Sequence, residues 1–141
     1  MSAAHSTKDE WLVGEGEYEG HRLLVRRNVG AEPMAGNARY PFKVGIAIPF
    51  LAPQKDGMPG KDELQLFGRI EDLVYDFFDA KRRGILCLVI ITRGMREFVI
   101  YSQIDDITEL IDALAGHFPA YDFQHIIEQD EHWDEYMRWA A

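Results

Sequence analysis

Two kinds of hydrophobic periodicity alternate between Tyr40 and Glu128, in the order strand, helix, strand, strand, helix, strand. The strand-like segments alternate apolar with polar residues or are apolar throughout, whereas the helix-like segments repeat their apolar residues about every 3.6 positions. This is the order of the split βαβ, or ferredoxin-like, plan, in which two helices cover one face of an antiparallel sheet. The pattern predicts an α+β fold but not an activity, because this plan hosts many unrelated functions.

The elements that carry this pattern can be placed along the chain. The expected core strands are 42–50, 85–91, 96–101 and 121–127, and the expected helices occupy 62–83 and 106–116. Two further strand segments near the N-terminus, joined by a turn at Gly20, predict an added β-hairpin. At the other end, Asp130 is expected to cap a short C-terminal helix. Residues 1–10 are predicted to be a disordered tail, and residues 11–141 a single α+β domain.

The strand Ile85–Ile91 is the most hydrophobic of the chain and is apolar on both faces. In the ferredoxin-like plan it lies at an edge of the sheet, where an unpaired apolar strand invites aggregation. We therefore expect the N-terminal hairpin, or the partner subunit of a homodimer, to cover this edge. The sheet face away from the helices should be covered too, by a dimer contact or by aromatic residues acting as core or interface packing. These aromatic residues, for which a ligand cage is the alternative, are Trp133, Tyr136 and Trp139.

Composition and charge argue against several classes of function. The chain has 141 residues, and 24 acidic against 15 basic residues give it a formal net charge of −9. This charge repels phosphate backbones, so we expect no nucleic-acid partner. The longest apolar run, Ile85–Ile91, is too short to span a bilayer. There is no signal-peptide core near the N-terminus, and a single cysteine allows no intrachain disulfide. We expect an acidic cytoplasmic protein of bacterial type that does not contact membranes.

Nucleophile and metal chemistry find little support in the sequence. Cys87 lies within the apolar strand and is expected to be a buried, unreactive thiol. No serine has the glycine-flanked context of a hydrolase nucleophile, and no glycine-rich phosphate loop is present. The histidines lack metal-ligand spacing, and His125 is expected in the core. The acidic run 128–135 should be solvated, with loose binding of a hard cation as the alternative. We expect no cofactor and no metal.

Arg93 and Arg96, with Tyr101 nearby, form the best candidate contact for an anion or a partner. The sequence places both arginines at the tip of a β-hairpin, and guanidinium groups on a rigid turn suit carboxylates and phosphates. The alternative is a solvated tip in which Arg96 pairs with an acidic neighbour. A second basic cluster is expected to pair with the glutamates of the N-terminal hairpin, and it comprises Arg22, Arg26 and Arg27.

A set of motifs runs along nearly the whole chain, from Trp11 to Trp139. The sharpest are the turn Thr92-Arg93-Gly94-Met95-Arg96-Glu97-Phe98 and the closing Asp130-x-x-Trp133-x-x-Tyr136; the others are Trp11, Tyr40-Pro41, Glu71-Asp72 and Tyr101. With these motifs in this order, the chain resembles the bacterial family catalogued as domain of unknown function six-nine-five. The resemblance implies no catalytic residues, because the family has no assigned activity. Some members resemble fusions to a module similar to the protein regulator of ribonuclease E. The sequence ends shortly after Tyr136, so we do not expect it to regulate that nuclease directly.

The function favoured by these observations is a non-catalytic interaction domain that binds a protein partner or a small anionic ligand. Its working surface is expected on the uncovered sheet face, together with the long flexible loops 30–39 and 51–60. The alternative is a small enzyme with its site between these two loops and the Arg93 hairpin. An enzyme should have a deep pocket in which at least two titratable groups have strongly shifted pKa values, whereas a binding module should not.

Overall fold

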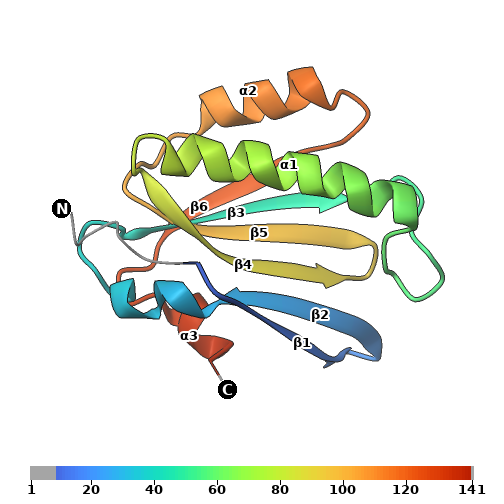
Figure 1. Cartoon of the computed structure of the whole chain (residues 1–141), viewed down its shortest axis with the longest axis horizontal. Coiled ribbons are helices and arrows are strands. Elements are labelled where there is room, and N and C mark those ends of the chain that lie inside the picture. The colour runs from blue at the N-terminus through green and yellow to red at the C-terminus, as the bar shows by residue number, and fades with distance from the viewer. Residues whose placement is uncertain (1–8, 141) are drawn as a thin grey trace.

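The computed structural model describes residues 9–140, which form a six-stranded antiparallel sheet with helices packed on it (Figure 1). The strand order across the sheet is β1-β2-β4-β5-β3-β6. The α+β class predicted from the sequence is therefore confirmed. The elements in chain order are β1 (Trp11–Tyr18), β2 (His21–Asn28), η2 (Val29–Met34), β3 (Phe42–Pro49), α1 (Lys61–Asp79), β4 (Gly84–Thr92), β5 (Met95–Ser102), α2 (Thr108–His117), β6 (Gln124–Gln129) and α3 (Asp134–Arg138).

β1 and β2 form the predicted N-terminal hairpin, which is closed by a two-residue turn. The turn residues Glu19 and Gly20 have φ angles of 51° and 81°, and positive φ at both positions is the mark of a type I′ turn, whose twist matches that of paired strands. The other side of β2 pairs with β4, where Leu24 lies opposite Ile91. The hairpin thus covers the edge of the most apolar strand, and the expectation of such a cover is confirmed.

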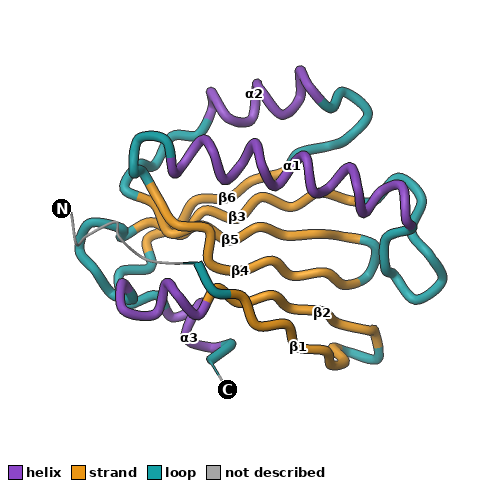
Figure 2. Tube along the Cα trace, viewed as in Figure 1, coloured by secondary structure: helices purple, strands orange, loops and turns teal. Residues whose placement is uncertain are grey.

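α1 and α2 pack on one face of the sheet and enclose the larger part of the core (Figure 2). The buried side chains of α1 recur at helical spacing because one stripe of this amphipathic helix faces the sheet. They are Phe67, Ile70, Val74 and Phe78. Burying side chains of this size contributes roughly 1.5–3 kcal/mol each, so this layer supplies much of the stability.

η2 and α3 cover the opposite face at one end of the sheet. Ala31 and Met34 of η2 are buried there with Trp133 and Tyr136, against β2, β4 and β5. The prediction of a flexible loop over 30–39 is therefore wrong for its first half, which is a 3-10 helix. The reason is that Ala31 and Met34, three positions apart, fall on one side of this turn and anchor it, which outweighs its glycine and proline content.

The helix ends differ from the sequence-based expectation. α1 ends at Asp79, so the basic run 81–83 follows the helix instead of forming its last turn. α2 begins at Thr108. Asp106, the first residue of the expected helix, instead precedes it and accepts hydrogen bonds from the backbone N–H and the hydroxyl of Thr108, at 2.9 and 2.7 Å.

The last strand also begins later than predicted. β6 starts at Gln124, so Tyr121 and Phe123 precede it. His125 is exposed, and its predicted place in the core is wrong. His125 is exposed because β6 lies at the edge of the sheet, next to β3, where side chains remain accessible to solvent.

Residues 1–8 lie outside the described part of the chain, and with them most of the predicted disordered tail. From Asp9 onward the chain is tied to β2. Asn28 Nδ2 donates to Asp9 Oδ1 at 3.0 Å, and the backbone N–H of Glu10 donates to Asn28 Oδ1 at 3.1 Å. Among the described residues, no helix has both the length and the apolar character needed to cross a membrane.

Candidate functional site

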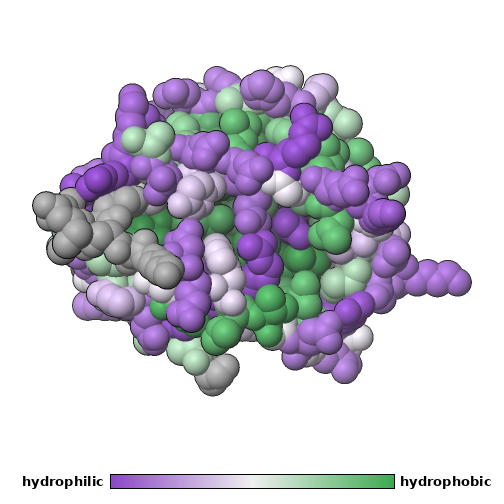
Figure 3. Space-filling model, viewed as in Figure 1, coloured by the Kyte–Doolittle hydropathy of each residue, from purple (hydrophilic) through white to green (hydrophobic). Residues whose placement is uncertain are grey.

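A groove of about 760 Å³ lies on the helix-covered side of the sheet, between α1, β2 and the loop 51–60. In Figure 3, apolar surface is exposed among polar side chains in this region, below α1. We call it the α1–β2 groove. Its apolar lining is Leu24, Met58, Pro59, Leu64 and Ile91, and its basic lining is Arg22, Arg26, Arg69 and Arg96.

The alternation of side chains along the strands decides which residues form the floor of this groove. Arg22, Leu24 and Arg26 are two residues apart on β2 and therefore point to the same face of the sheet. Leu24 lies opposite Ile91 of β4, which in turn lies opposite Arg96 of β5. One row across the sheet thus runs from Leu24 through Ile91 to Arg96, and the fold sets a guanidinium among apolar side chains beneath α1.

Arg96 is buried and only partly paired. Its side chain is 5% exposed, and its Nη1 lies 3.8 Å from Oε1 of Glu71. That distance makes an ion pair without a hydrogen bond. Within the described chain, Nε of Arg96 has no hydrogen-bond partner. The rings of Phe67 and Phe98 lie 5.0 and 5.9 Å from the guanidinium carbon.

This environment changes the acidity of Arg96 but not its charge at neutral pH. Burial lowers its pKa from the ordinary arginine value to about 10, Glu71 acts in the opposite direction, and Arg26 lowers it further. A buried polar group without its hydrogen bonds costs roughly 1–3 kcal/mol, and more when it is charged. A bound anion would supply the missing acceptors, which makes Arg96 a candidate for ligand contact.

Glu71 is already engaged by a different arginine. It accepts two hydrogen bonds from Arg26, at 2.7 Å from Nη1 and 3.2 Å from Nη2. The guanidinium of Arg26 lies over the ring of Trp11, 4.7 Å from its centroid. Because this bidentate pair holds the carboxylate toward Arg26, two arginines share one negative charge and the cluster stays positive.

The loop 51–60 forms the outer wall of the groove and is fixed at two points. The N–H of Gly94, in the turn between β4 and β5, donates to the carbonyl oxygen of Gly57 at 2.9 Å. The N–H groups of Leu51 and Ala52 donate to the carboxylate of Glu63, at 2.8 and 3.0 Å. Burial opposes the ionisation of Glu63, but these bonds and one from a tyrosine hydroxyl outweigh it and lower its pKa.

Arg22 joins the loop to the hairpin at the mouth of the groove. Its Nη1 donates to Asp56 at 2.9 Å and its Nη2 donates to Glu15 at 2.7 Å. All three side chains are well exposed. Exposed pairs of this kind contribute no more than about 1 kcal/mol, so a ligand at the mouth can replace them.

The arrangement suits the binding of an anion better than catalysis. Arg22 at the mouth is paired with Asp56 and Glu15, whereas Arg26 and Arg96 share the single carboxylate of Glu71, so the uncompensated positive charge lies at Arg26 and Arg96 in a chain of net charge −9. Among the described residues that line the groove, only Arg96 has a pKa moved far from the ordinary value. Cys87 is buried elsewhere, as predicted, and burial raises the pKa of its thiol.

The predicted contact residues Arg93, Arg96 and Tyr101 do not come together. Arg93 is exposed at the β4–β5 turn with a φ of 52°, and its Nη1 donates to Glu19 at 3.3 Å. Arg96 lines the α1–β2 groove. Tyr101 is five residues further along β5 and so points to the other face, where its hydroxyl donates to Asp130 at 2.7 Å.

The predicted aromatic residues gather on that other face. Trp133 is fully buried and stacks on Tyr101, with ring centroids 4.2 Å apart. Tyr136 is also buried, and its hydroxyl donates to a backbone carbonyl of β2 at 2.7 Å. Trp139 is partly exposed, and its Nε1 donates to Glu135 at 2.8 Å. Trp133 and Tyr136 are therefore core residues, whereas Trp139 borders open surface.

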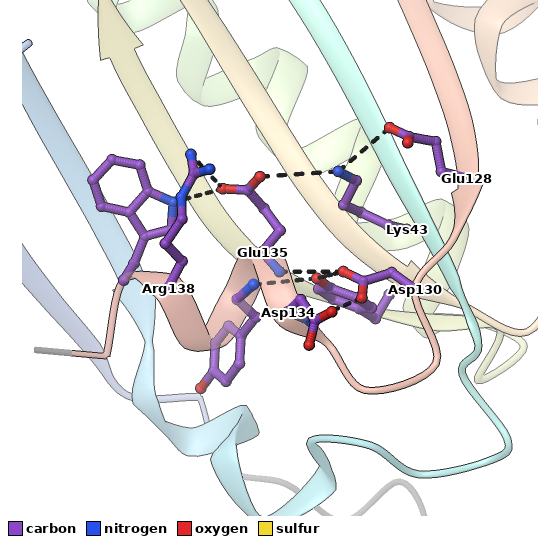
Figure 4. A network of polar contacts seen from close by, with 9 residues as sticks. Lys43, Glu128, Asp130, Asp134, Glu135 and Arg138 are labelled. Atoms are coloured by element: carbon purple, nitrogen blue, oxygen red, sulfur yellow. Dashed lines mark hydrogen bonds and ion pairs between the residues drawn. The ribbon is translucent and has the colours of Figure 1, made fainter.

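Two of the five carboxylates in the acidic run 128–135 form ion pairs within the chain (Figure 4). Lys43 Nζ lies 3.4 Å from Glu128 and 3.9 Å from Glu135, and Arg138 pairs with Glu135 at 3.2 Å. Asp130 accepts hydrogen bonds from the first two N–H groups of α3, at 2.9 and 3.2 Å. In the described part of the chain, no group of three or more His, Cys, Asp or Glu residues could hold a metal ion.

The loops 30–39 and 51–60 do not share one site. They precede and follow β3 and therefore lie at opposite ends of this eight-residue strand (Figure 1). The loop 51–60 contacts the Arg93 turn, whereas the first half of 30–39 packs on the far end of the sheet. An enzyme site between both loops and the Arg93 hairpin is excluded by this geometry.

Sequence reasoning missed the centre of the groove. It paired Arg26 with the hairpin glutamates, and it treated Glu71 as a surface residue beside the apolar stripe of its helix, with Arg69 or Lys81 as the partner of Glu71 or Asp72. The contact between Arg26 and Glu71 joins residues 45 positions apart, and it exists because α1 packs beside β2. The one available signal was the alternation Arg22-x-Leu24-x-Arg26, which puts two arginines on one face of a strand.

Fold and groove together define a small α+β domain, built on one antiparallel sheet, with an arginine-lined groove beside its longest helix. The model of the family of unknown function DUF695 matches residues 9–139. The chain belongs to this family, and the resemblance found in the sequence is confirmed. Neither a curated protein nor a solved structure matches the chain.

Proposed function

We propose that this protein is a non-catalytic binding domain that recognises a small ligand with an oxyanion, either a carboxylate or a phosphate, in the α1–β2 groove. The observation that carries the proposal is Arg96. Its charged side chain is 5% exposed, and its Nε has no acceptor among the described residues. Guanidinium forks bind carboxylates and phosphates through paired hydrogen bonds. A bound oxyanion completes the hydrogen bonding of a group that the chain leaves incomplete.

The surroundings of Arg96 support the same class of ligand. Arg26 adds a second positive charge beside it, held by Glu71. Leu24 and Ile91 lie in the same row of the sheet and give the ligand an apolar surface to rest on. The ligand therefore carries its oxyanion on a small apolar group.

We also propose that the core of this domain follows the ferredoxin-like plan. The order β6-β3-β5-β4, with α1 and α2 on one face, supports this assignment. On this view the N-terminal hairpin is an addition at the β4 edge. The α1–β2 groove then exists only because of that addition, since β2 forms one of its walls.

Arg96→Met tests the proposed function. The methionine keeps the apolar packing and removes the guanidinium, so we expect affinity for inorganic phosphate or for acetate to fall about tenfold to one-hundredfold, as loss of a charged hydrogen bond implies. Stability should be unchanged or higher, because an incompletely paired buried charge is removed. Amide NMR shifts during titration with each ion measure affinity and location, and thermal unfolding measures stability.

The matched control is Arg93→Gln, which removes the same charge from an exposed turn. It should leave the affinity for both ions unchanged. Equal weakening by both variants would mean nonspecific charge attraction, and the proposal would be wrong. It would also be wrong if neither ion shifted the amide signals of the groove.

A further inference from the structure

We propose a second binding site, on the opposite face of the N-terminal hairpin, that takes a hydrophobic carboxylate. By this we mean a single carboxylate on a flat or unbranched apolar body. A trough of about 600 Å³ lies there, over β1 and β2 and beside the C-terminal segment. Its volume is within the range of roughly 300–1,000 Å³ that small-molecule sites occupy. The trough is lined chiefly by Leu12, Leu23, Val25, Arg27 and Trp139.

Glycines form the outer floor of this trough. Gly14 lies opposite Val25, and Gly16 lies opposite Leu23, so all four share one face of the hairpin. A Cβ added at either glycine would meet nothing within 4 Å. The strand β1 thus presents bare backbone beside two apolar side chains, and this open, flat surface accommodates an apolar body lying along the strands.

Arg27 closes the inner end of the trough. Its side chain is 8% exposed, and its guanidinium carbon lies 4.0 Å from the ring centroid of Tyr136. Nε donates to the carbonyl of Tyr136 at 3.5 Å, whereas Nη2 has no hydrogen-bond partner within the described residues. A buried arginine of fixed orientation, with one covered nitrogen that lacks an acceptor, suits a carboxylate that enters in place of the side chain covering it.

Glu32 stands where the ligand's carboxylate would bind. Its Oε1 is 3.7 Å from Nη2 of Arg27, beyond hydrogen-bond length, and its side chain is 53% exposed. Such a loosely held, exposed carboxylate is displaced at low cost. A ligand that replaces it makes a shorter bond to Arg27 and covers Leu23, Val25 and Trp139.

This site is independent of the α1–β2 groove. Arg26 and Arg27 are consecutive on β2, so their side chains point to opposite faces of the sheet. Each of the two sites has its own buried arginine with a nitrogen that lacks an acceptor among the described residues. It is Arg96 in the α1–β2 groove and Arg27 in the trough. Loss of one site should leave the other intact.

The test uses octanoate and phenylacetate, each beside its uncharged amide, titrated into the full chain. Binding is followed by the amide NMR signals of Gly14 and Gly16, which report on the floor of the trough. We expect at least one carboxylate to bind roughly tenfold or more tightly than its amide, because only the carboxylate forms a charged hydrogen bond. Equal affinity for acid and amide would overturn the proposal, as would shifts confined to the α1–β2 groove.

Gly16→Val fills the floor without a clash and without a positive φ to strain it. It should keep the fold and weaken binding at least tenfold, while Gln124→Val, which adds a valine on the other edge strand, should have no effect. Glu32→Gln removes the competing charge and should strengthen binding of the carboxylates only. Unchanged affinity in both Gly16→Val and Glu32→Gln would contradict the proposal. Arg96→Met should leave the affinity of the trough for both carboxylates unchanged, which separates this test from that of the α1–β2 groove.

Discussion

Glu97 and Arg96 are neighbours on β5, so their side chains lie on opposite faces of the sheet. Glu97 sits over Gly45 of β3, where an added Cβ would come 2.9 Å from its Oε2. Burial raises the pKa of Glu97, Glu135 raises it further, and Lys43 partly opposes this. The folded protein therefore holds a proton on Glu97 more tightly than the unfolded chain does.

The expected consequence is a loss of stability as the pH rises. The unfolded chain releases the proton first, so the free energy of unfolding falls between the ordinary carboxyl pKa and the raised pKa of Glu97. Glu97→Gln removes this loss and should stabilise the protein at neutral pH by about 1 kcal/mol, the lower end of the cost of taking a polar group out of water. Urea unfolding from acidic to neutral pH measures the difference. A gap that does not widen as the pH rises would contradict this account.

Single residues also show where sequence reasoning reaches its limit. The burial of Cys87 followed from its apolar neighbours in the chain. The burial of Arg96 did not, because Arg96 is only the second residue of β5 after the turn at 93–94, and only the pairing with β4 and β3 shows which face its side chain takes. A local pattern predicts alternation, but it does not say which face α1 will cover.

At the scale of elements, α3 has only five residues and could not persist alone, since isolated helices of this length are unstable in water. Its first two N–H groups bond to Asp130, which also accepts the hydroxyl of Tyr101. Burial opposes the ionisation of Asp130, but these three bonds outweigh it and lower its pKa. The N-cap position of α3 is held by Trp133, but the carboxylate of Asp130, three residues earlier, accepts the bonds from the helix N-terminus that were expected from the sequence.

Asp130→Ala should therefore cost about 2–3 kcal/mol of stability, from the lost cap and the lost charged hydrogen bond. Because the pKa of Asp130 is lowered on folding, this contribution is present above the ordinary aspartate pKa and disappears as the pH falls through the lowered value. Chemical unfolding at neutral and acidic pH, followed by tryptophan fluorescence, measures both effects. Asp134→Ala, in the exposed first turn of α3, is the control and should change little. A full-sized effect of Asp130→Ala in acid would show that charge is not the cause.

At the scale of the whole molecule, the N-terminal hairpin extends the sheet and seals its most apolar strand. The need for a cover followed from the sequence of Ile85–Ile91, although a partner subunit would have satisfied it equally. The order of strands and helices could be predicted from the sequence because each segment is long and has a regular hydrophobic period. η2 was not, because its anchoring by Ala31 and Met34 depends on a surface formed by distant strands.

Leu24→Pro tests the role of this seal. The type I′ turn makes Tyr18 and His21 a hydrogen-bonded pair, and alternation along the ladder then directs the N–H of Leu24 toward β4. Proline removes that bond and part of the packing, so we expect a loss of about 2–3 kcal/mol. Amide exchange in Ile85–Ile91 should accelerate, and light scattering should detect self-association.

Val13→Pro is the matched control for this variant. By the same alternation, the N–H of Val13 points away from β2 at the outer edge of the sheet, where proline is tolerated. It should preserve slow exchange in β4 and a monodisperse sample. If both proline variants behaved alike, the seal would not be what protects β4.

The consecutive arginines of β2 give this strand a sensitivity that its sequence alone does not reveal. Arg26 belongs to one side of the sheet and Arg27 to the other, and only their odd or even place in the strand decides which. Deleting a single residue between the turn and Arg26 would turn every side chain beyond the deletion to the opposite face of the sheet. Arg26 would then face the trough and Arg27 the α1–β2 groove, each away from its present partners. In this segment, the number of residues therefore matters to both surfaces as much as which residues they are.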